Sequence, residues 1–300
     1  MINGLINVYK ETGFTSFDVV AVMRGISGQR KIGHTGTLDP QAEGVLPICL
    51  GNATKLCDML NDKRKEYVAT FMLGRRTDTL DDTGEVLEER PVVATKESIL
   101  EAVKSFVGGY NQLPPMFSAK WVDGKRLYDL ARKGISVERT PVFVEIFDIE
   151  VMDISLPYVT IRVECGKGTY IRSLCEDIAA KCGDIAVMTK LIRTKVDEFT
   201  TENARTLSEL TAIKNEGNLL SVVTPTDFCF MKLKKVRTLK DFRKYIDNGN
   251  KLRFHMVDVE DIPAPGERVR VYNDEDIFVG VFYYDKEDES LKPEKMFLEQ

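Results

Sequence analysis

Residues 33–47 read GHTGTLDPQAEGVLP, and this stretch decides how the rest of the chain is interpreted. It contains three glycines, two prolines, one histidine and one aspartate. Glycine and proline at this density interrupt helices and strands, so we expect an irregular loop that exposes backbone amides. Such a loop can hold the carboxylate of Asp39 in a fixed position. The alternative is structural, because Asp39 followed by Pro40 is also a typical helix start with aspartate as the N-cap.

Two further segments could carry chemistry, and each also has a structural interpretation. In residues 166–174, GKGTYIRSL, Tyr170 and Arg172 share a face if the backbone is extended. The alternative is a surface turn with a buried tyrosine and a solvated arginine. Tyr67 in the sequence KEY is either a substrate contact or an ordinary core aromatic of a strand. His34 is likewise either a binding residue or a structural histidine.

Strand and helix patterns intermix along the first 230 residues without the regular rhythm of a βαβ fold. We expect strands at residues 65–73 and 159–165, and helices at residues 17–26 (N-cap Ser16, ended by Gly28), from Thr95 to Gly108 and at residues 171–182 (ended by Gly183). The apolar side of the second helix is expected to comprise Ile99, Leu100, Val103, Phe106 and Val107. The prediction is an α+β fold with a mixed, largely antiparallel sheet.

The composition changes near residue 230. Residues 231–253 hold nine basic and two acidic side chains, whereas residues 258–289 hold eleven acidic and three basic ones. Strand-like runs follow at residues 268–272 and 277–284. We therefore predict a first domain at residues 1–230 and a small β-rich domain at residues 231–300.

The composition of the 300 residues excludes several classes of protein. With 43% hydrophobic and 30% charged residues, the chain is expected to be globular, and it has no apolar run long enough to span a membrane. The first residues lack the pattern of a secretory signal, so we expect a cytoplasmic protein. The six cysteines form no CxxC pair and the two histidines are far apart, which predicts reduced thiols and no metal site.

The formal net charge of −5 argues at first against a polyanionic partner. Basic residues nevertheless gather near the 33–47 loop, within residues 113–134 and within residues 231–253, while acidic residues are concentrated elsewhere. Because affinity depends on the field within about 10 Å, we expect one narrow basic track.

Taken together, the motifs resemble the TruB family of bacterial tRNA pseudouridine synthases, which isomerise uridine 55 of tRNA. The resemblance is strong over roughly residues 4–200. Besides the 33–47 loop, it rests on GLINVYK at 4–10, KEYVATFMLGRRTDTLDDTGEV at 65–86, LPPMFSAKWVDGKRLYDLARKG at 113–134, GKGTYIRSLCEDIA at 166–179 and LIRTKV at 191–196. The terminal domain resembles a PUA domain more weakly, through Asn248-Gly249, RVRVY at 268–272 and residues 291–293.

The resemblance implies a role for each candidate residue. Asp39 corresponds to the catalytic carboxylate, acting either covalently or by removing a proton from the sugar, and Arg172 to the arginine that pairs with it. Tyr67 corresponds to the tyrosine that packs on the target base. His34 corresponds to the histidine that stabilises the opened T-loop, and the further uridine contacts correspond to Tyr170 and Leu191. The reaction needs neither a metal nor another cofactor.

The implied partner is the T stem-loop of tRNA, with no membrane and no obligate protein partner. Residues 113–140 correspond to an insertion that covers the RNA stem. Recognition of a folded stem-loop depends on shape and phosphates. Each candidate phosphate contact could also be an ordinary solvated side chain; the candidates are Arg24, Arg30, Lys31, Lys120, Lys125, Arg126, Arg132 and Lys133.

Three alternative functions remain open at this point. An RNA-guided pseudouridine synthase shares the loop and the PUA-like end, but generally lacks a segment like residues 123–141. A non-catalytic RNA-binding or tRNA-folding module could use the same groove. A glycosidase acting on free sugars would need a second carboxylate at a defined separation, for which Glu43 is the nearby candidate.

Overall fold

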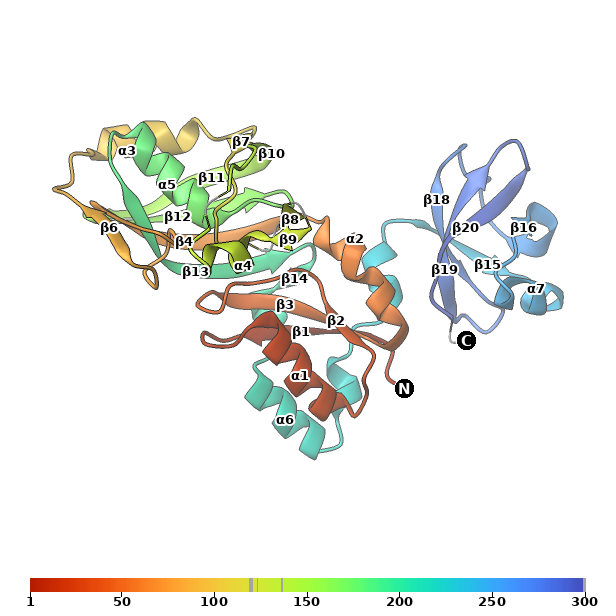
Figure 1. Ribbon diagram of the computed structural model, residues 1–300. Helices are drawn as coiled ribbons and strands as arrows, with labels where there is room; N and C mark the ends of the chain where they lie inside the picture. Colours follow the sequence, from red (N-terminus) through yellow and green to blue (C-terminus); the bar gives the residue numbers. More distant parts are fainter. Residues whose placement is uncertain (119–120, 123, 136, 299–300) are drawn as a thin grey trace.

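The structure is a computed structural model that describes residues 1–118, 121–122, 124–135 and 137–298. Its centre is an eight-stranded sheet of order β1-β3-β13-β4-β12-β11, with β2 paired to β3 and β14 paired to β13 (Figure 1). All pairs are antiparallel except β3 with β13. The strands are β1 (Gly4–Lys10), β2 (Ile32–His34), β3 (Glu43–Leu50), β4 (Lys65–Leu73), β11 (Ile146–Ser155), β12 (Tyr158–Cys165), β13 (Ala186–Val196) and β14 (Phe199–Thr200).

Strand β4 forms where the alternating pattern predicted it. Tyr67, Ala69, Phe71 and Leu73 are all buried, and the residues between them are only half-buried. Alternate side chains of a strand point to opposite faces, so these four line the face that is covered by helices. The strand predicted at residues 159–165 is confirmed as β12 by the same alternation.

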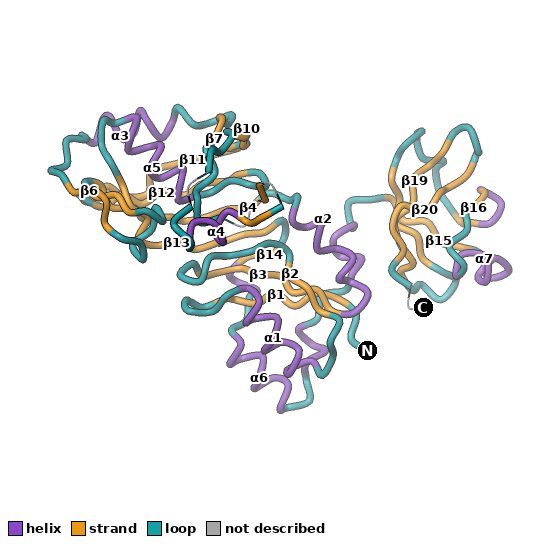
Figure 2. Tube along the Cα trace, viewed as in Figure 1, coloured by secondary structure: helices purple, strands orange, loops and turns teal. Residues whose placement is uncertain are grey.

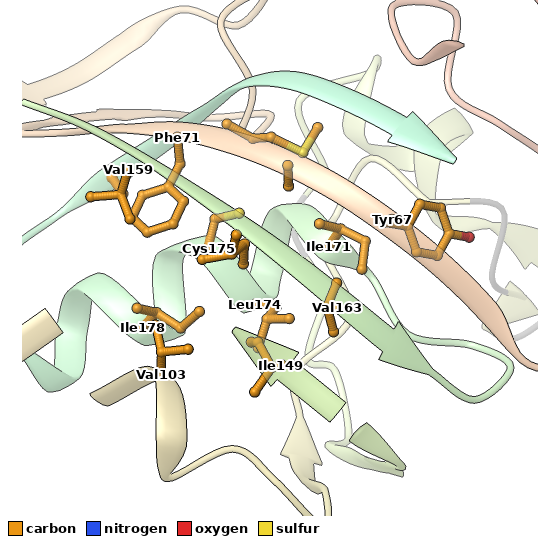
Figure 3. Packing of buried hydrophobic residues seen from close by; sticks show 14 of the residues in the cluster. Tyr67, Phe71, Val103, Ile149, Val159, Val163, Ile171, Leu174, Cys175 and Ile178 are labelled. Atoms are coloured by element: carbon orange, nitrogen blue, oxygen red, sulfur yellow. The ribbon is translucent and has the colours of Figure 1, made fainter. Parts of the chain in front are cut away.

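Two pairs of helices cover the sheet (Figures 1 and 2). Helices α1 (Ser16–Ser27) and α6 (Leu207–Asn215) pack on the apolar side chains of β1 and β3. Helices α3 (Lys96–Lys104) and α5 (Ile171–Lys181) pack on β4, β11 and β12. Figure 3 shows α5 side chains such as Leu174 and Ile178 facing this core, with Tyr67 at one end and its hydroxyl directed away.

The N-terminal cap of α1 differs from the prediction. The cap is Thr15 and not Ser16, because Asp18 lies three residues after Thr15 and completes a capping box with it. The helix ends at Gly28 as predicted, where φ is +67°, a conformation that glycine adopts without steric cost.

Helix α3 is shorter than predicted. Its N-cap is Thr95, as expected, but the helix ends at Lys104 rather than at Gly108. Leu100 and Val107, expected on the apolar side, are 43% and 53% exposed. The predicted helix at residues 171–182 is confirmed as α5, with Cys182 as its C-cap.

Smaller elements surround the main sheet. Strands β5 and β6 form a hairpin, β7 pairs with β10, and β8 pairs with β9 inside the segment 113–140. These elements are β5 (Arg75–Thr77), β6 (Val86–Glu89), β7 (Tyr110–Gln112), β8 (Trp121–Val122), β9 (Lys125–Arg126), β10 (Val142–Val144), α2 (Cys57–Asn61) and α4 (Leu127–Ala131). Short 3-10 helices occupy Gly51–Leu56, Thr201–Asn203, Leu219–Val222, Thr226–Phe230, Lys240–Phe242 and Phe254–Met256.

The C-terminal part forms a separate six-stranded sheet of order β16-β20-β19-β18-β15-β17 with its own apolar core. Its elements are β15 (Lys234–Thr238), α7 (Arg243–Asp247), β16 (Leu252–Arg253), β17 (Val257–Asp258), β18 (Arg268–Tyr272), β19 (Phe278–Asp285) and β20 (Ser290–Met296). Phe230, Val281 and Phe297 pack with side chains of the first part, including Val196 and Phe199. We propose the domain boundary near residue 230, just before β15.

The predicted fold class is confirmed: α+β, with a mixed, largely antiparallel sheet and a small β-rich C-terminal part. The six cysteines are free, as expected. Among the residues that the structure describes, no helix is long and apolar enough to cross a membrane.

Candidate active site

The loop between β2 and β3 carries Asp39 and is shorter than predicted. Residues 33–34 belong to β2 and residues 43–47 to β3, so only residues 35–42 are irregular. Pro40 and Gln41 form a turn, and the Ala42 amide donates to the Asp39 carbonyl at 3.1 Å. The interpretation of Asp39 as a helix N-cap is therefore wrong, and its carboxylate is available for another partner.

A side chain of α1 fixes the loop directly before Asp39. The Leu38 amide donates to Ser16 Oγ at 2.9 Å. The Leu38 side chain is buried in the same core as Tyr67. The backbone preceding the carboxylate is thus held by a hydrogen bond and by packing.

Arg172 holds the carboxylate of Asp39. Its Nε lies 3.0 Å from Asp39 Oδ2, and the side chains are 7% and 39% exposed respectively. The two terminal nitrogens donate to the carbonyl oxygens of Thr79, at 2.8 Å, and Phe117, at 2.9 Å. Because three directions of the planar guanidinium are occupied, the arginine cannot rotate without breaking these contacts. Arg172 is not a solvated surface residue, contrary to the structural alternative.

A second carboxylate, that of Asp81, also lies near the Arg172 guanidinium. Asp81 Oδ2 lies 3.5 Å from Arg172 Nη1. Its Oδ1 accepts hydrogen bonds from Thr79 Oγ1 at 2.8 Å and from the Thr83 amide at 3.1 Å. Asp81 belongs to the quoted segment 65–86 but was not singled out from the sequence. The alternation of aspartate and threonine there, TDTLDDT, is the signal for such a turn.

Tyr67 lies at the end of the core, next to a buried arginine. Its register partner on β13 is Arg193. Burial raises the pKa of the Tyr67 phenol, and the neighbouring Arg193 guanidinium opposes that rise. The phenol is therefore neutral at physiological pH, and its ring is a packing surface.

Arg193 is a site residue that the sequence analysis missed. It is fully buried, and it donates to the carbonyl oxygens of Val45 at 2.8 Å, Gly36 at 3.3 Å and Thr37 at 3.5 Å. It therefore connects the Asp39 loop to the strand next to Tyr67. The available signal was a basic residue at an inward-facing position of the strand in LIRTKV.

Lys10 is a second buried cation under the loop, and it was also missed. Its Nζ donates to the carbonyl oxygens of Glu11 and Pro40 at 3.1 Å and of Ala42 at 2.5 Å. Burial lowers the pKa of Lys10 to about 8, an effect that nearby Asp39 opposes. Carbonyl groups of the loop are thus held by an ammonium beneath them.

Tyr170 and Leu191 come from two elements that contact β4: α5, which packs on it, and β13, which pairs with it. Tyr170 is the N-cap residue of α5, so it and Arg172 are not on one face of an extended segment. The Tyr170 amide donates to Gln112 Oε1 at 2.8 Å, and Gln112 Nε2 donates back to the Tyr170 carbonyl at 3.0 Å. Leu191 is buried on β13 in the same core as Tyr67.

His34 lies at the end of β2, beside the first turn of α1. Its Nδ1 accepts a hydrogen bond from the Gly36 amide at 3.3 Å. Burial, followed by the charge of Arg193, lowers the pKa of His34. The imidazole is therefore neutral at pH 7 and serves as an aromatic ring rather than as a cation.

The candidate phosphate contacts are only partly described. Arg24, Arg30, Lys31, Arg132 and Lys133 are exposed, and none forms an ion pair with a described residue. Arg132 lies over the ring of Tyr128, 5.6 Å from its centroid. Lys120 and the side chains of Lys125 and Arg126 lie outside the described part of the chain.

The basic stretch 231–253, where the sequence shows basic residues gathering, is partly neutralised by neighbouring acidic residues. Its strand β15 is covered by acidic residues of the segment 258–289: Lys234 pairs with Glu267 at 3.0 Å, and Lys235 and Arg237 both pair with Asp276, at 2.7 and 2.9 Å. Arg243 and Lys251 also pair with acidic residues of that segment, whereas Lys240, Lys244 and Arg253 are exposed and form no ion pair with a described residue. The basic and acidic stretches of the C-terminal part are therefore in contact along β15, and only part of the basic stretch stays free of acidic partners.

Comparison with known proteins places this site in a family. Residues 24–171 match the TruB family pseudouridylate synthase N-terminal domain, and residues 172–231 match the tRNA pseudouridylate synthase B C-terminal domain. The chain is 49% identical to tRNA pseudouridine synthase B of Lachnoclostridium phytofermentans, over 99% of this chain and 100% of that protein. It is 44% identical to the protein of the same name from Clostridium tetani, over 95% and 96% of the two chains.

Solved structures share the fold. A chain of a Cbf5-Nop10-Gar1 complex superposes with a TM-score of 0.73 and 27% identity, over 98% of this chain and 85% of that one. A chain of an H/ACA RNP bound to a substrate RNA containing 2'-deoxyuridine gives the same TM-score at 25% identity, over 99% and 85% of the chains. The family matches and the nearly full-length relatives lead to one conclusion: the chain belongs to the TruB family of pseudouridylate synthases.

Proposed function

We propose that the protein isomerises uridine to pseudouridine at position 55, in the T-loop of tRNA, and that Asp39 is the catalytic carboxylate. The single observation that carries the chemical part is the pair of Asp39 with a buried Arg172, each of whose three guanidinium nitrogens has a partner. The names of the relatives support tRNA as the substrate. The reaction takes place in the cytoplasm.

The reaction rearranges bonds within one nucleotide. The C1′–N1 bond breaks, the uracil turns, and a C1′–C5 bond forms; N1 gains a proton and C5 loses one. There is no net change in oxidation state and no group donor. The residues of the pocket therefore need only to stabilise charge, hold the detached base and move protons.

Asp39 acts at the sugar. Breaking the glycosidic bond builds positive character at C1′, and a carboxylate beside it stabilises this charge, as in glycosidases. The carboxylate either attacks the sugar or removes a proton from it. Arg172 fixes the orientation of the carboxylate through the charge-assisted contact of its Nε with Asp39 Oδ2.

Tyr67, Tyr170 and Leu191 form the pocket for the base. Tyr67 packs on the uracil, and because burial raises the pKa of its phenol, stacking suits it better than proton removal. The apolar surroundings exclude water, which would otherwise capture the opened sugar and leave an abasic site. The target base must leave its stack to reach this pocket, at a cost of a few kcal/mol.

His34 stabilises the opened T-loop, and the exposed cations of the catalytic domain contact phosphates. The neutral imidazole offers a flat apolar surface to bases near the gap left by the extruded uridine. Arg24, Arg30 and Lys31 precede the active loop, whereas Arg132 and Lys133 extend the basic surface into the segment 113–140. The domain at residues 231–300 is proposed as a PUA-like RNA-binding domain.

One observation favours a second candidate, an RNA-guided synthase subunit: the fold likeness to chains of H/ACA-type complexes. The two candidates differ in whether the protein works alone. Product formed by the purified protein without any guide RNA supports the stand-alone enzyme.

The catalytic assignment is tested with Asp39→Asn. We expect this variant to form no pseudouridine while its affinity for tRNA stays within several-fold of wild type, because the amide keeps the shape of the side chain and loses its charge. Turnover would be followed on an unmodified tRNA transcript, and binding on the same transcript by filter retention. Product formation at the wild-type rate by Asp39→Asn would exclude the carboxylate from the chemistry.

A further inference from the structure

An exposed aromatic ring lies beside the proposed active site and has no role in the protein core. Phe17, in the first turn of α1, is 67% exposed. The residues that α1 uses for packing are on its other side: Val19, Val20, Met23 and Ile26 are buried. Isolated exposed apolar residues are common on proteins, so exposure alone assigns nothing to Phe17.

The position of the ring is fixed relative to the active loop. The capping box of Thr15 and Asp18 fixes the backbone of the first turn of α1. Ser16, the residue after Thr15, accepts a hydrogen bond from the Leu38 amide at 2.9 Å. Phe17 follows Ser16 directly, and Leu38 directly precedes Asp39. The ring is thus held on the same rigid assembly that holds the carboxylate.

Phe17 also contacts a residue of the proposed RNA site. Its ring meets the imidazole of His34 edge-to-face, with centroids 5.6 Å apart and planes at 89°. Because burial lowers the pKa of His34, two uncharged aromatic rings lie together at the edge of the loop. Edge-to-face contact leaves a face of the Phe17 ring uncovered by its partner.

We propose that Phe17 is a substrate-positioning residue: with His34 it forms an aromatic platform on which an unpaired base of the RNA loop stacks after the target uridine has been extruded. This inference rests on the proposed function, and it adds a contact on α1. The ligand is a nucleobase, because the exposed surface is a flat apolar ring and unpaired RNA bases are bound by stacking on such rings. The nearby exposed cations Arg24, Arg30 and Lys31 suit the phosphates of the same strand.

The test uses Phe17→Ala, Phe17→Tyr and a matched control, Ile262→Ala. Ile262 is 64% exposed and belongs to the C-terminal part, so its replacement removes a similar exposed apolar side chain far from the loop in sequence. The thermal unfolding midpoint should stay the same in all three variants. The substrate is a T stem-loop RNA in which a base next to the target uridine is replaced by 2-aminopurine, whose fluorescence is quenched by stacking.

The proposal predicts that Phe17→Ala loses catalytic efficiency and base stacking, and that the conservative variant Phe17→Tyr keeps both. Phe17→Ala should lower kcat/KM by about tenfold, mainly through KM, as expected for one lost base–aromatic stack. It should also leave the bound 2-aminopurine brighter than in the wild-type complex. Phe17→Tyr should retain the wild-type kcat/KM and the wild-type quenching of 2-aminopurine, and Ile262→Ala should match wild type in both. Unchanged kcat/KM together with unchanged fluorescence in Phe17→Ala would overturn the proposal.

The outcome is separable from the catalytic assignment. Asp39→Asn should give the same fluorescence quenching as wild type while forming no product. If the wild-type protein forms no product and Phe17→Ala still loses the quenching, the stacking contact stands and the catalytic assignment fails. If product forms normally and the quenching is independent of Phe17, the catalytic assignment stands and the stacking contact is wrong.

Discussion

At the scale of single residues, the site depends on the geometry of Arg172. One guanidinium contacts the Asp39 carboxylate, two backbone carbonyls and, more distantly, Asp81. The carbonyls come from Thr79 and Phe117, which are far apart in sequence. Arg172 therefore joins three segments of the chain as well as supplying charge.

Arg172→Lys tests whether this geometry matters beyond the charge. A lysine keeps the positive charge but cannot reach the carboxylate and both carbonyls together. We expect kcat to fall roughly 10- to 100-fold, equivalent to about 1.4–2.8 kcal/mol of lost transition-state stabilisation. The measurement is product formation at saturating tRNA. The control is Arg162→Lys, because Arg162 of β12 is also held by carboxylates, those of Glu66, Asp148 and Glu150, but has no contact with Asp39. This change should leave kcat unchanged, and equal effects of the two changes would contradict the assignment.

Lys10 makes the stability of the protein depend on pH. Its pKa falls from the ordinary 10.5 to about 8 on folding, so the unfolded chain binds more protons between these values. Stability therefore rises with pH through this window. Lys10→Met removes that contribution, so the free energy of unfolding of wild type relative to the variant should increase between pH 8 and 10.5. Urea unfolding at several pH values measures the difference; a difference independent of pH would show that Lys10 does not titrate as described.

At the scale of elements, local patterns predicted much of the first domain. The alternation in residues 65–73 and 159–165 led to the correct strands because one face of each is covered by helices. The cap of α1 was misplaced by one residue, although the Thr15-x-x-Asp18 spacing that decides it was visible in the sequence. The hydrogen bond of Ser16 to the Leu38 amide was not predictable, since it joins segments that only the tertiary fold brings together.

The same limit applies to Arg193. The sequence could place it on a strand facing inward, but not show that the loop carbonyls are its partners. Its backbone lies so close to β3 that a Cβ on Gly44 would come within 2.2 Å of the Arg193 carbonyl oxygen. A glycine is therefore required at position 44, where φ is +111°.

Arg193→Met tests the link between β13 and the active loop. The change leaves the carbonyls of Gly36, Thr37 and Val45 without their donor, so the loop 35–42 should open more often. We expect amide hydrogen exchange in this loop to speed up by roughly tenfold, corresponding to about 1.4 kcal/mol, with kcat reduced. Amides of α6, which packs on the other half of the sheet, serve as the internal reference. Unchanged exchange in the loop would mean that Arg193 does not hold it.

At the scale of the whole molecule, the charge distribution is the feature that the sequence described least well. Counting residues separated a basic stretch from an acidic one, but the fold places the two in contact across the C-terminal sheet. The roles of the site residues came from the family resemblance, and their local chemistry alone left each of them open. No sequence pattern indicated the long-range contacts around Asp39.

This distribution predicts which lysines and arginines determine the salt dependence of tRNA binding. Arg132→Ala with Lys133→Ala removes two exposed cations without an ion-pair partner among the described residues. The slope of log K against log salt should flatten by roughly 1.5 units. Lys234→Ala with Lys235→Ala should change the slope little, because Glu267 and Asp276 already neutralise these lysines. A larger effect from the second pair would place the main phosphate contacts in the C-terminal domain.

The central claim is that this protein, acting alone, converts uridine 55 of tRNA to pseudouridine. The most direct test incubates the purified chain with an unmodified tRNA transcript, in the presence of a chelator and without guide RNA, and maps pseudouridine by mass spectrometry. The account predicts pseudouridine at position 55 of the transcript, with none formed by Asp39→Asn. A transcript in which position 55 remains uridine would contradict it.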